Sequence, residues 1–176
     1  MAQNKNIKEV LKDITTLIFD VDGVLTNGQV LLLPNGDKVR ELNSKDAFAL
    51  QLAVKSGLNV AIITGGTGDF VKEALQGLGI SSIYTRVSNK LDVFKDYVSE
   101  NNLKVEECLY MGDDMPDFWV MEQVALPCCP ADAASDIKAI SIYISQCEGG
   151  KGAVRDIVEQ VLRVKGLWHT DAGKVW

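Results

Sequence analysis

Two aspartates near the N-terminus stand close together where an apolar run ends. Asp20 and Asp22 lie at the end of the β-branched and aromatic run 15–21, with one residue between them. Burying two like charges there costs several kcal/mol unless a cation or a proton compensates the repulsion. The pair therefore indicates a site that binds a cation or a proton. For this segment alone, a solvated strand end followed by an Asp-Gly turn is the alternative.

A second acidic group follows another apolar run. Asp113, Asp114 and Asp117 come directly after the run 108–111 (CLYM) and Gly112. Three acids within five residues indicate a hard cation, and magnesium prefers oxygen ligands and keeps several waters. The alternative is an acidic helix N-terminus, which the helix dipole also favours.

Two further candidates lie between these acidic groups. Thr64 ends the apolar run 59–64, where its hydroxyl and the amide of Gly65 can donate to a phosphoryl oxygen. Taken alone, Thr-Gly after a strand is usually a turn. Lys90 stands near the start of a predicted helix, where the dipole does not favour a cation, so an anionic partner is expected. A solvated surface lysine is the alternative.

The chain that positions these residues alternates between strand-like and helix-like periodicity. Strands are predicted at 15–21, 30–33, 38–42, 59–64, 83–85, 108–111, 124–126 and 141–144, and helices at 46–56, 68–76, 89–101, 116–122, 133–138 and 152–165. This alternation predicts an α/β fold, a Rossmann-like doubly wound parallel sheet with helices on both faces. Ligands bind outside the carboxyl ends of such strands, and Asp20, Thr64 and Asp113 all follow a strand.

Turn and cap residues give the predicted boundaries. The Asn-Gly at 35–36 predicts a β-hairpin after the first strand. Asp46 and Ser88 are the predicted N-caps of the helices that follow them, and Gly57 ends the first of these. The tail 166–176 has no clear element.

Composition limits the class of protein. The 176 residues fit one domain, and the 47% hydrophobic content can supply its core. The net charge of -6 argues against a nucleic-acid partner. No apolar run reaches the length of a membrane span, and the polar segment 1–12 does not look like a signal peptide, so a cytoplasmic location is expected. The four cysteines lack C-x-x-C spacing and are expected to be reduced, buried thiols.

Four motifs in this order resemble those of the haloacid dehalogenase (HAD) superfamily. They are D-x-D-G at 20–23, Thr-Gly at 64–65, a lysine at 90 and G-D-D-x-x-D at 112–117. The resemblance implies that Asp20 is the nucleophile and forms an aspartyl phosphate. It implies that Asp22 is the general acid and base, which requires a raised pKa. Because pumps and dehalogenases of the superfamily lack Asp22, its presence indicates hydrolysis of a phosphate ester.

The same resemblance implies a magnesium site beside the phosphoryl group. Asp20, Asp113 and the backbone carbonyl of Asp22 are the implied ligands. Asp114 and Asp117 are the implied positioning groups. Thr64 then contacts the phosphoryl group, and Lys90 neutralises it together with the nucleophile.

Within the superfamily, the chain from about residue 7 to 165 resembles the 3-deoxy-D-manno-octulosonate 8-phosphate phosphatases. Between the first two motifs, 28–61 leaves room for a hairpin and one helix, so no cap domain is expected. The matching stretches are 20–28, 59–65, 88–91, 110–114 and 149–155. The resemblance implies an acidic sugar phosphate as substrate, in lipopolysaccharide sugar biosynthesis.

That branch forms homotetramers in which the hairpin joins subunits and neighbours complete each active site. Here the hairpin is 28–43, and the run 31–33 (LLL) suits an interface better than a free hairpin. Packing of the hairpin on its own domain is the alternative. Arg155 or Lys151 is expected to reach a neighbour's substrate carboxylate, which the planar guanidinium fits. Arg155 as a surface residue is again the alternative.

Two departures from the branch leave the substrate open. Gly66 stands where Thr-Gly is commonly followed by arginine, and Lys45 stands in place of another arginine. With Gly23, Gly65 and Arg155 they form the expected phosphate- and substrate-binding set. A nine-carbon 2-keto-3-deoxy sugar acid 9-phosphate is an alternative substrate. A non-specific phosphatase and a non-catalytic tetramerisation module are further alternatives, and the intact motifs argue against the module.

Overall fold

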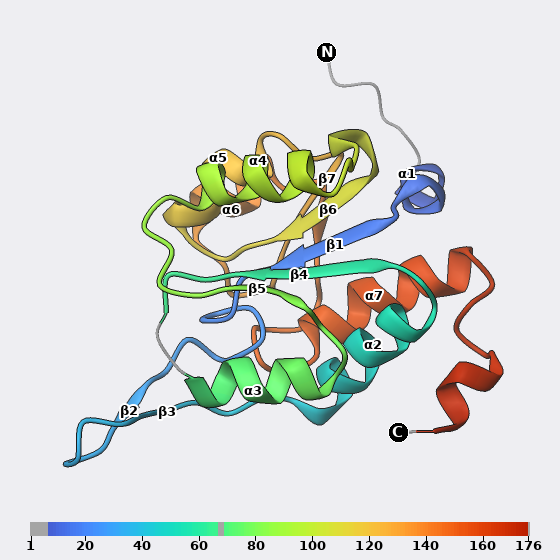
Figure 1. Ribbon diagram of the computed structural model, residues 1–176. Coiled ribbons are helices and arrows are strands. Elements are labelled where there is room, and N and C mark those ends of the chain that lie inside the picture. Colours follow the sequence, from blue (N-terminus) through green and yellow to red (C-terminus); the bar gives the residue numbers. More distant parts are fainter. Residues whose placement is uncertain (1–6, 67–68, 176) are drawn as a thin grey trace.

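A sheet of parallel strands forms the middle layer of the computed structural model, which describes residues 7–66 and 69–175 (Figure 1). The strand order is β5-β4-β1-β6-β7-β8. The strands are β1 (Thr16–Phe19), β4 (Asn59–Ile63), β5 (Ser82–Tyr84), β6 (Cys108–Met111), β7 (Leu126–Cys129) and β8 (Tyr143–Ile144). All neighbours in this sheet pair in parallel, which confirms the predicted doubly wound architecture.

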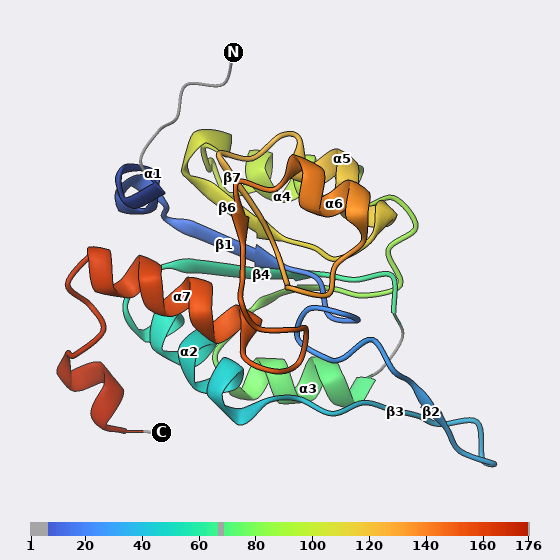
Figure 2. The same ribbon diagram turned by 180° about the vertical axis from the view of Figure 1, so that it is seen from behind.

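Helices cover both faces of the sheet, as Figures 1 and 2 show from opposite sides. One face carries α2 (Ser44–Lys55), α3 (Asp69–Gly77) and α7 (Ala153–Val164). The other face carries α4 (Lys90–Glu100), α5 (Phe118–Met121) and α6 (Ser135–Ile140). A short α1 (Ile7–Asp13), which the sequence did not predict, precedes β1. No helix among the described residues is long and apolar enough to cross a bilayer.

The central strand β1 shows how the two apolar layers arise. All four of its residues are buried, as expected for a parallel strand covered on both faces. Leu17 and Phe19 join the core beneath α2 and α7, whereas Ile18 joins the core beneath α4, α5 and α6. Phe19 pairs with Ile62 of β4 and Met111 of β6. The carboxyl ends of β4, β1 and β6 therefore lie side by side.

The hairpin after β1 extends away from the body of the molecule (Figure 1). It consists of β2 (Leu31–Leu32) and β3 (Lys38–Val39), which pair in antiparallel fashion and are shorter than the predicted strands. Leu31 is 62% exposed and Leu32 69%. These two side chains do not pack on their own domain, so that alternative is wrong for them. The hairpin instead exposes apolar surface.

Both predicted N-caps are wrong by one to three residues. Asn43 caps α2 and Asn89 caps α4, each through a side-chain oxygen that accepts from the N–H two residues later, at 2.8 and 3.1 Å. Asparagine is as good a cap as aspartate or serine, so the sequence offered competing choices. Asp46 lies instead in the first turn of α2, where its Oδ1 accepts from the N–H of Arg155 at 2.6 Å.

Other boundaries shift by small amounts. β7 begins at Leu126, two residues later than predicted, and continues through Pro127, whose carbonyl accepts from the N–H of Ile142. α6 also starts two residues late, and the predicted helix 116–122 is a 3-10 turn (η2, Met115–Asp117) followed by α5. Residue 68, the predicted start of α3, lies outside the described residues. The tail forms a 3-10 turn (η3, Asp171–Lys174), and Trp168 packs edge-on against Phe48 of α2.

Candidate active site

The carboxyl ends of the three central strands line a cavity of about 480 Å³. Asp20 directly follows β1, Thr64 directly follows β4, and Asp113 lies two residues beyond β6. The cavity is also lined by Asp22, Gly28, Gly65, Gly66, Lys90, Asp114, Asp117 and Trp119. The fold therefore gathers the acidic, hydroxyl and ammonium groups of all four motifs at one place.

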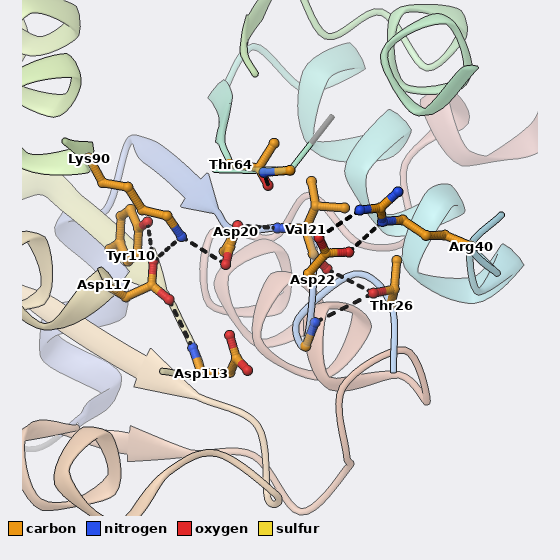
Figure 3. Close-up of polar contacts among 12 residues, drawn as sticks. Asp20, Val21, Asp22, Thr26, Arg40, Thr64, Lys90, Tyr110, Asp113 and Asp117 are labelled. Atoms are coloured by element: carbon orange, nitrogen blue, oxygen red, sulfur yellow. Dashed lines mark hydrogen bonds and ion pairs between the residues drawn. The ribbon is translucent and has the colours of Figure 1, made fainter. Parts of the chain in front are cut away.

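Asp20 is held from two sides, as Figure 3 shows. Its Oδ1 accepts from the N–H of Val21 at 2.7 Å, and its Oδ2 lies 2.8 Å from Nζ of Lys90. The side chain is 9% exposed. The carboxylate is therefore fixed with an open side toward the cavity, as a nucleophile requires.

Asp117 anchors the cationic side of the site. Its Oδ1 lies 2.7 Å from Nζ of Lys90 and accepts from the Tyr110 hydroxyl at 2.6 Å. Its Oδ2 accepts from the N–H of Asp113 at 3.2 Å. Because the Asp117 side chain is 1% exposed and fully engaged, it fixes both the ammonium group and the backbone of Asp113. This geometry fits the positioning role expected for Asp117.

The carboxylates of this site are close enough to share a cation. One oxygen from each of Asp20, Asp113 and Asp117 lies within 4.8 Å of the others. Asp117 is already bound to Lys90 and Tyr110, so Asp20 and Asp113 are the better candidates for metal ligands. Asp114 is exposed at the rim of the cavity. The carboxylate of Asp22 is not part of this cluster.

The charge balance at the site favours a divalent cation. Burial raises the pKa of Asp20 to about 6; repulsion from Asp117 adds to this, and Lys90 opposes it. Burial, together with Asp117 and Asp20, raises the pKa of Asp113 to about 7. Burial lowers the pKa of Lys90, but its two aspartate partners outweigh this and leave it above its ordinary value. One ammonium group cannot balance these carboxylates, and an all-oxygen donor set fits magnesium.

Two glycines give the carboxylates their room. Gly23 has a φ of +85°, and a Cβ there would lie 2.0 Å from Oδ2 of Asp113. A Cβ on Gly112 would lie 2.3 Å from Cβ of Asp117. Gly23 therefore admits the Asp113 carboxylate, and its expected contact with phosphate stays a prediction. The corresponding role of Gly112 was not predicted from the sequence.

The loop between Asp20 and the hairpin is ordered by Thr26, which is fully buried. Its hydroxyl donates to the carbonyl of Val21 at 3.2 Å and accepts from the N–H groups of Gly23 and Gly28 at 3.4 and 3.2 Å. This turn returns the chain beside the cavity. On the opposite wall, Oγ1 of the buried Thr64 accepts from the N–H of Gly66 at 3.1 Å.

Asp22 has a partner that sequence reasoning missed. Arg40, the residue after β3, places Nε 2.5 Å from Oδ1 and Nη2 3.0 Å from Oδ2 of Asp22. This contact also raises the pKa of Arg40, since the carboxylate accepts from it, although burial opposes the shift. Nothing in the spacing of these two residues predicts the contact, because it depends on how the hairpin leaves the domain.

No family model matches the sequence. The chain is 36% identical over 155 residues to the 3-deoxy-D-manno-octulosonate 8-phosphate phosphatase KdsC of Escherichia coli strain K12, covering 88% of this chain and 82% of that one. The enzyme of the same name from Yersinia pestis is 32% identical over 150 residues, covering 85% and 80%. This chain belongs to the 3-deoxy-D-manno-octulosonate 8-phosphate phosphatase family. The resemblance inferred from the four motifs is confirmed.

Solved structures described as members of this family or of the HAD superfamily have the same fold. The phosphatase of this name from Moraxella catarrhalis, in complex with a magnesium ion, a phosphate ion and KDO, superimposes with a TM-score of 0.90 at 29% identity, covering 94% of this chain and 95% of that one. A Legionella pneumophila structure described as subfamily III A of the HAD superfamily gives 0.88 at 29% identity, covering 92% and 88%. Between β1 and β4 this chain adds only the hairpin and α2, as expected for a family member without a cap.

Three residues expected to bind substrate lie outside the cavity of their own chain. Lys45 is exposed in the first turn of α2. The Arg155 guanidinium stacks on the Trp168 ring at 4.3 Å and pairs with Glu159 at 2.7 Å. Lys151 pairs with Glu148 at the surface. The expected contact of Arg155 or Lys151 with a neighbour's substrate stays a prediction, and so does substrate binding by Lys45.

Proposed function

We propose that this chain hydrolyses 3-deoxy-D-manno-octulosonate 8-phosphate, with magnesium, through a phosphorylated Asp20. One observation carries the proposal. In this chain, which belongs to that phosphatase family, Asp20 lies 2.8 Å from the buried ammonium group of Lys90, and both Asp20 and Asp113 line the same cavity. The products are the sugar acid and inorganic phosphate. This reaction belongs to lipopolysaccharide sugar biosynthesis.

The first half of the reaction transfers the phosphoryl group to the protein. Lys90 and the hydroxyl of Thr64 bind phosphoryl oxygens, and an oxygen of Asp20 attacks phosphorus in line with the ester oxygen. The bond between phosphorus and the ester oxygen breaks, and Asp22 gives its proton to the leaving alkoxide. Asp20 and Asp113 would hold the magnesium ion, which when bound neutralises charge on the transferring group and orients it.

The second half restores Asp20. Asp22, now a carboxylate, takes a proton from a water molecule that attacks phosphorus of the aspartyl phosphate. The bond between phosphorus and the Asp20 oxygen breaks, and phosphate leaves. Asp117 acts on both halves by holding Lys90 and the backbone of Asp113 in place. Asp114 lies at the rim and is proposed only as a positioning group.

We further propose a homo-oligomer joined through the hairpin at 28–43. The exposed apolar side chains of Leu31, Leu32 and Val39 support it, because an exposed apolar patch on a protruding hairpin marks a surface that a partner covers. A homotetramer in which neighbours complete each active site is the finer form of this proposal. The cytoplasmic location expected from the sequence remains a prediction.

The test is phosphate release from the eight-carbon ester and from the nine-carbon 2-keto-3-deoxy sugar acid 9-phosphate, each with magnesium and with chelator. Magnesium-dependent turnover that favours the eight-carbon ester supports the proposal. Preference for the nine-carbon ester would keep the mechanism and replace the substrate. Absence of turnover on both esters by folded protein would overturn the proposal in favour of a non-specific or non-catalytic role.

A further inference from the structure

The contact between Arg40 and Asp22 is the least expected feature of the site. Both oxygens of the Asp22 carboxylate are bound by one guanidinium group, in the two-pronged geometry that suits arginine and carboxylate. The Arg40 side chain is 5% exposed, and that of Asp22 is 31% exposed. Arg40 lies on the side of Asp22 that is away from Asp20, whereas Asp22 itself lines the cavity (Figure 3).

The surroundings hold Arg40 in this position. A small apolar space next to the pair is lined by Val21, Val71 and Thr85, among others. An arginine in such a setting is costly unless its charge is paired, and the Asp22 carboxylate provides a partner for that charge. Because Arg40 directly follows β3, this contact also ties the base of the hairpin to the domain.

Because Gly66 has no side chain, Asp22 and Arg40 have room to contact each other beside it. A Cβ at this position would lie 2.8 Å from Oδ2 of Asp22 and 3.3 Å from Nη2 of Arg40. Any larger residue would press on both partners. Gly66 stands where the common pattern has an arginine after Thr-Gly. In this chain the guanidinium group of Arg40, from the hairpin, lies next to that position.

We propose that Arg40 is a positioning residue that orients the Asp22 carboxylate for proton transfer, and that Gly66 keeps the space for this contact. The two-pronged contact restricts rotation of the Asp22 side chain. Each carboxylate oxygen has a second lone pair beside the one that Arg40 uses, so Oδ2 can carry the proton that goes to the ester oxygen and, once ionised, can accept a proton from the attacking water. The inference rests on the proposed function of Asp22 in this same site.

The test compares two leaving groups. The alkoxide of the sugar phosphate needs a proton from Asp22 as it departs, whereas p-nitrophenolate departs without one. The variants are Arg40→Ala, Arg40→Lys and Gly66→Ala. Lys38→Ala is the control, because Lys38 is an exposed residue of the same hairpin. Circular dichroism, melting temperature and gel filtration establish that each variant is folded and assembled.

For Arg40→Ala we expect kcat on the sugar phosphate to fall about tenfold or more, since general acid–base catalysis is worth about 10²–10⁴-fold. KM should stay within about threefold, because the contact acts on chemistry rather than on binding. The first-turnover release of p-nitrophenolate should change little. Gly66→Ala should give the same pattern, and Arg40→Lys should recover only part of the loss because an ammonium group lacks the two-pronged geometry.

Three results would overturn this inference. An increase in KM with unchanged kcat would mean that Arg40 binds the substrate instead. Equal losses on both substrates would mean that it does not act through the proton transfer of Asp22. Variants as active as Lys38→Ala would mean that the contact has no role. If the wild-type chain turns over p-nitrophenyl phosphate but not the eight-carbon ester, only the proposed substrate fails, and the comparison proceeds with an alkyl phosphate that the chain does hydrolyse.

Discussion

Nζ of Lys90 lies 2.8 Å from Oδ2 of Asp20, so the first residue of α4 contacts the residue that directly follows β1. The same ammonium group lies 2.7 Å from Oδ1 of Asp117. Lys90 is thus the buried cation between two carboxylates that follow neighbouring strands. The stability of the metal-free protein and the reactivity of Asp20 should both depend on it.

Replacing Lys90 with methionine should destabilise the fold as well as stop turnover. The change leaves two buried carboxylates without their shared partner, a loss of about 3–5 kcal/mol in the free energy of unfolding. Urea denaturation without metal measures it. Lys95→Met, at an exposed position of the same helix, is the matched control and should stay near wild type. A Lys90 variant as stable as this control would show that the cation is not needed for folding.

Asp20→Asn should separate activity from stability. Turnover should fall by about 10³-fold or more, because no other group can form the aspartyl phosphate. Without metal the variant should melt higher than wild type, since it removes a carboxylate whose pKa is raised by burial and by Asp117, and which itself adds to the raised pKa of the buried Asp113. Added magnesium should stabilise it less than wild type. Calorimetric melting with magnesium and with chelator tests both expectations; a lower melting temperature in chelator would contradict the charge argument.

The metal-free protein should lose stability as the pH rises. The pKa of Asp20 is about 6 and that of Asp113 about 7 in the folded state, against 3.8 for an ordinary aspartate. Between about pH 4 and 7 the folded state therefore binds more protons than the unfolded state, so the free energy of unfolding falls with pH. The affinity for magnesium should increase as the pH rises through this range, because fewer protons compete with the metal for the two carboxylates. Denaturation at several pH values, with and without the metal, measures this.

Asp46 provides a metal-independent comparison for that experiment. Burial raises its pKa to about 6, and within the described chain its Oδ2 has no hydrogen-bond partner. Asp46→Asn keeps the Oδ1 that accepts from the N–H of Arg155. It should therefore flatten part of the pH dependence with magnesium present or absent. A pH dependence unchanged by this variant would assign the whole effect to the metal site.

The hairpin prediction concerns assembly. Changing Leu31 and Leu32 to aspartate should shift the chain toward monomers, because their exposed side chains would carry charge into the proposed interface. Ser99→Asp, an exposed position on α4, adds charge elsewhere and is the control. Sedimentation velocity gives the oligomeric state. A wild-type monomer, or an assembly untouched by the double change, would rule out the hairpin as the contact.

The meeting of Asp20, Thr64 and Asp113 was predictable because parallel strands with buried, apolar sequences end at one edge of a sheet. The state of the cysteines was predictable as well. All four are free thiols, as expected, and only Cys147 is half-buried rather than buried. Local competition limited the rest. Asn43 and Asp46 are both suitable caps, and only the packing of α7 against α2 assigns Asp46 to the amide of Arg155.

Arg40 marks the clearest limit of the sequence analysis. It lies in the segment 38–42, which is predicted as a strand of the hairpin, but its contact with Asp22 depends on the path of the hairpin across the domain. Asp117 shows a milder form of the same limit. Its place in an acidic motif indicated a positioning role, but the contact with the Tyr110 hydroxyl follows from the backbone between them.

The central claim, a phosphorylated Asp20, can be tested by trapping. Asp22→Asn should accept a phosphoryl group from p-nitrophenyl phosphate with magnesium, because that leaving group needs no proton, and should lose it slowly for want of a base. Mass spectrometry of the peptide that contains residues 15–26 should then show one added phosphoryl group on Asp20, removable by hydroxylamine. Steady turnover by wild type together with no label on Asp20 in the variant, or a label on another residue, would contradict the account.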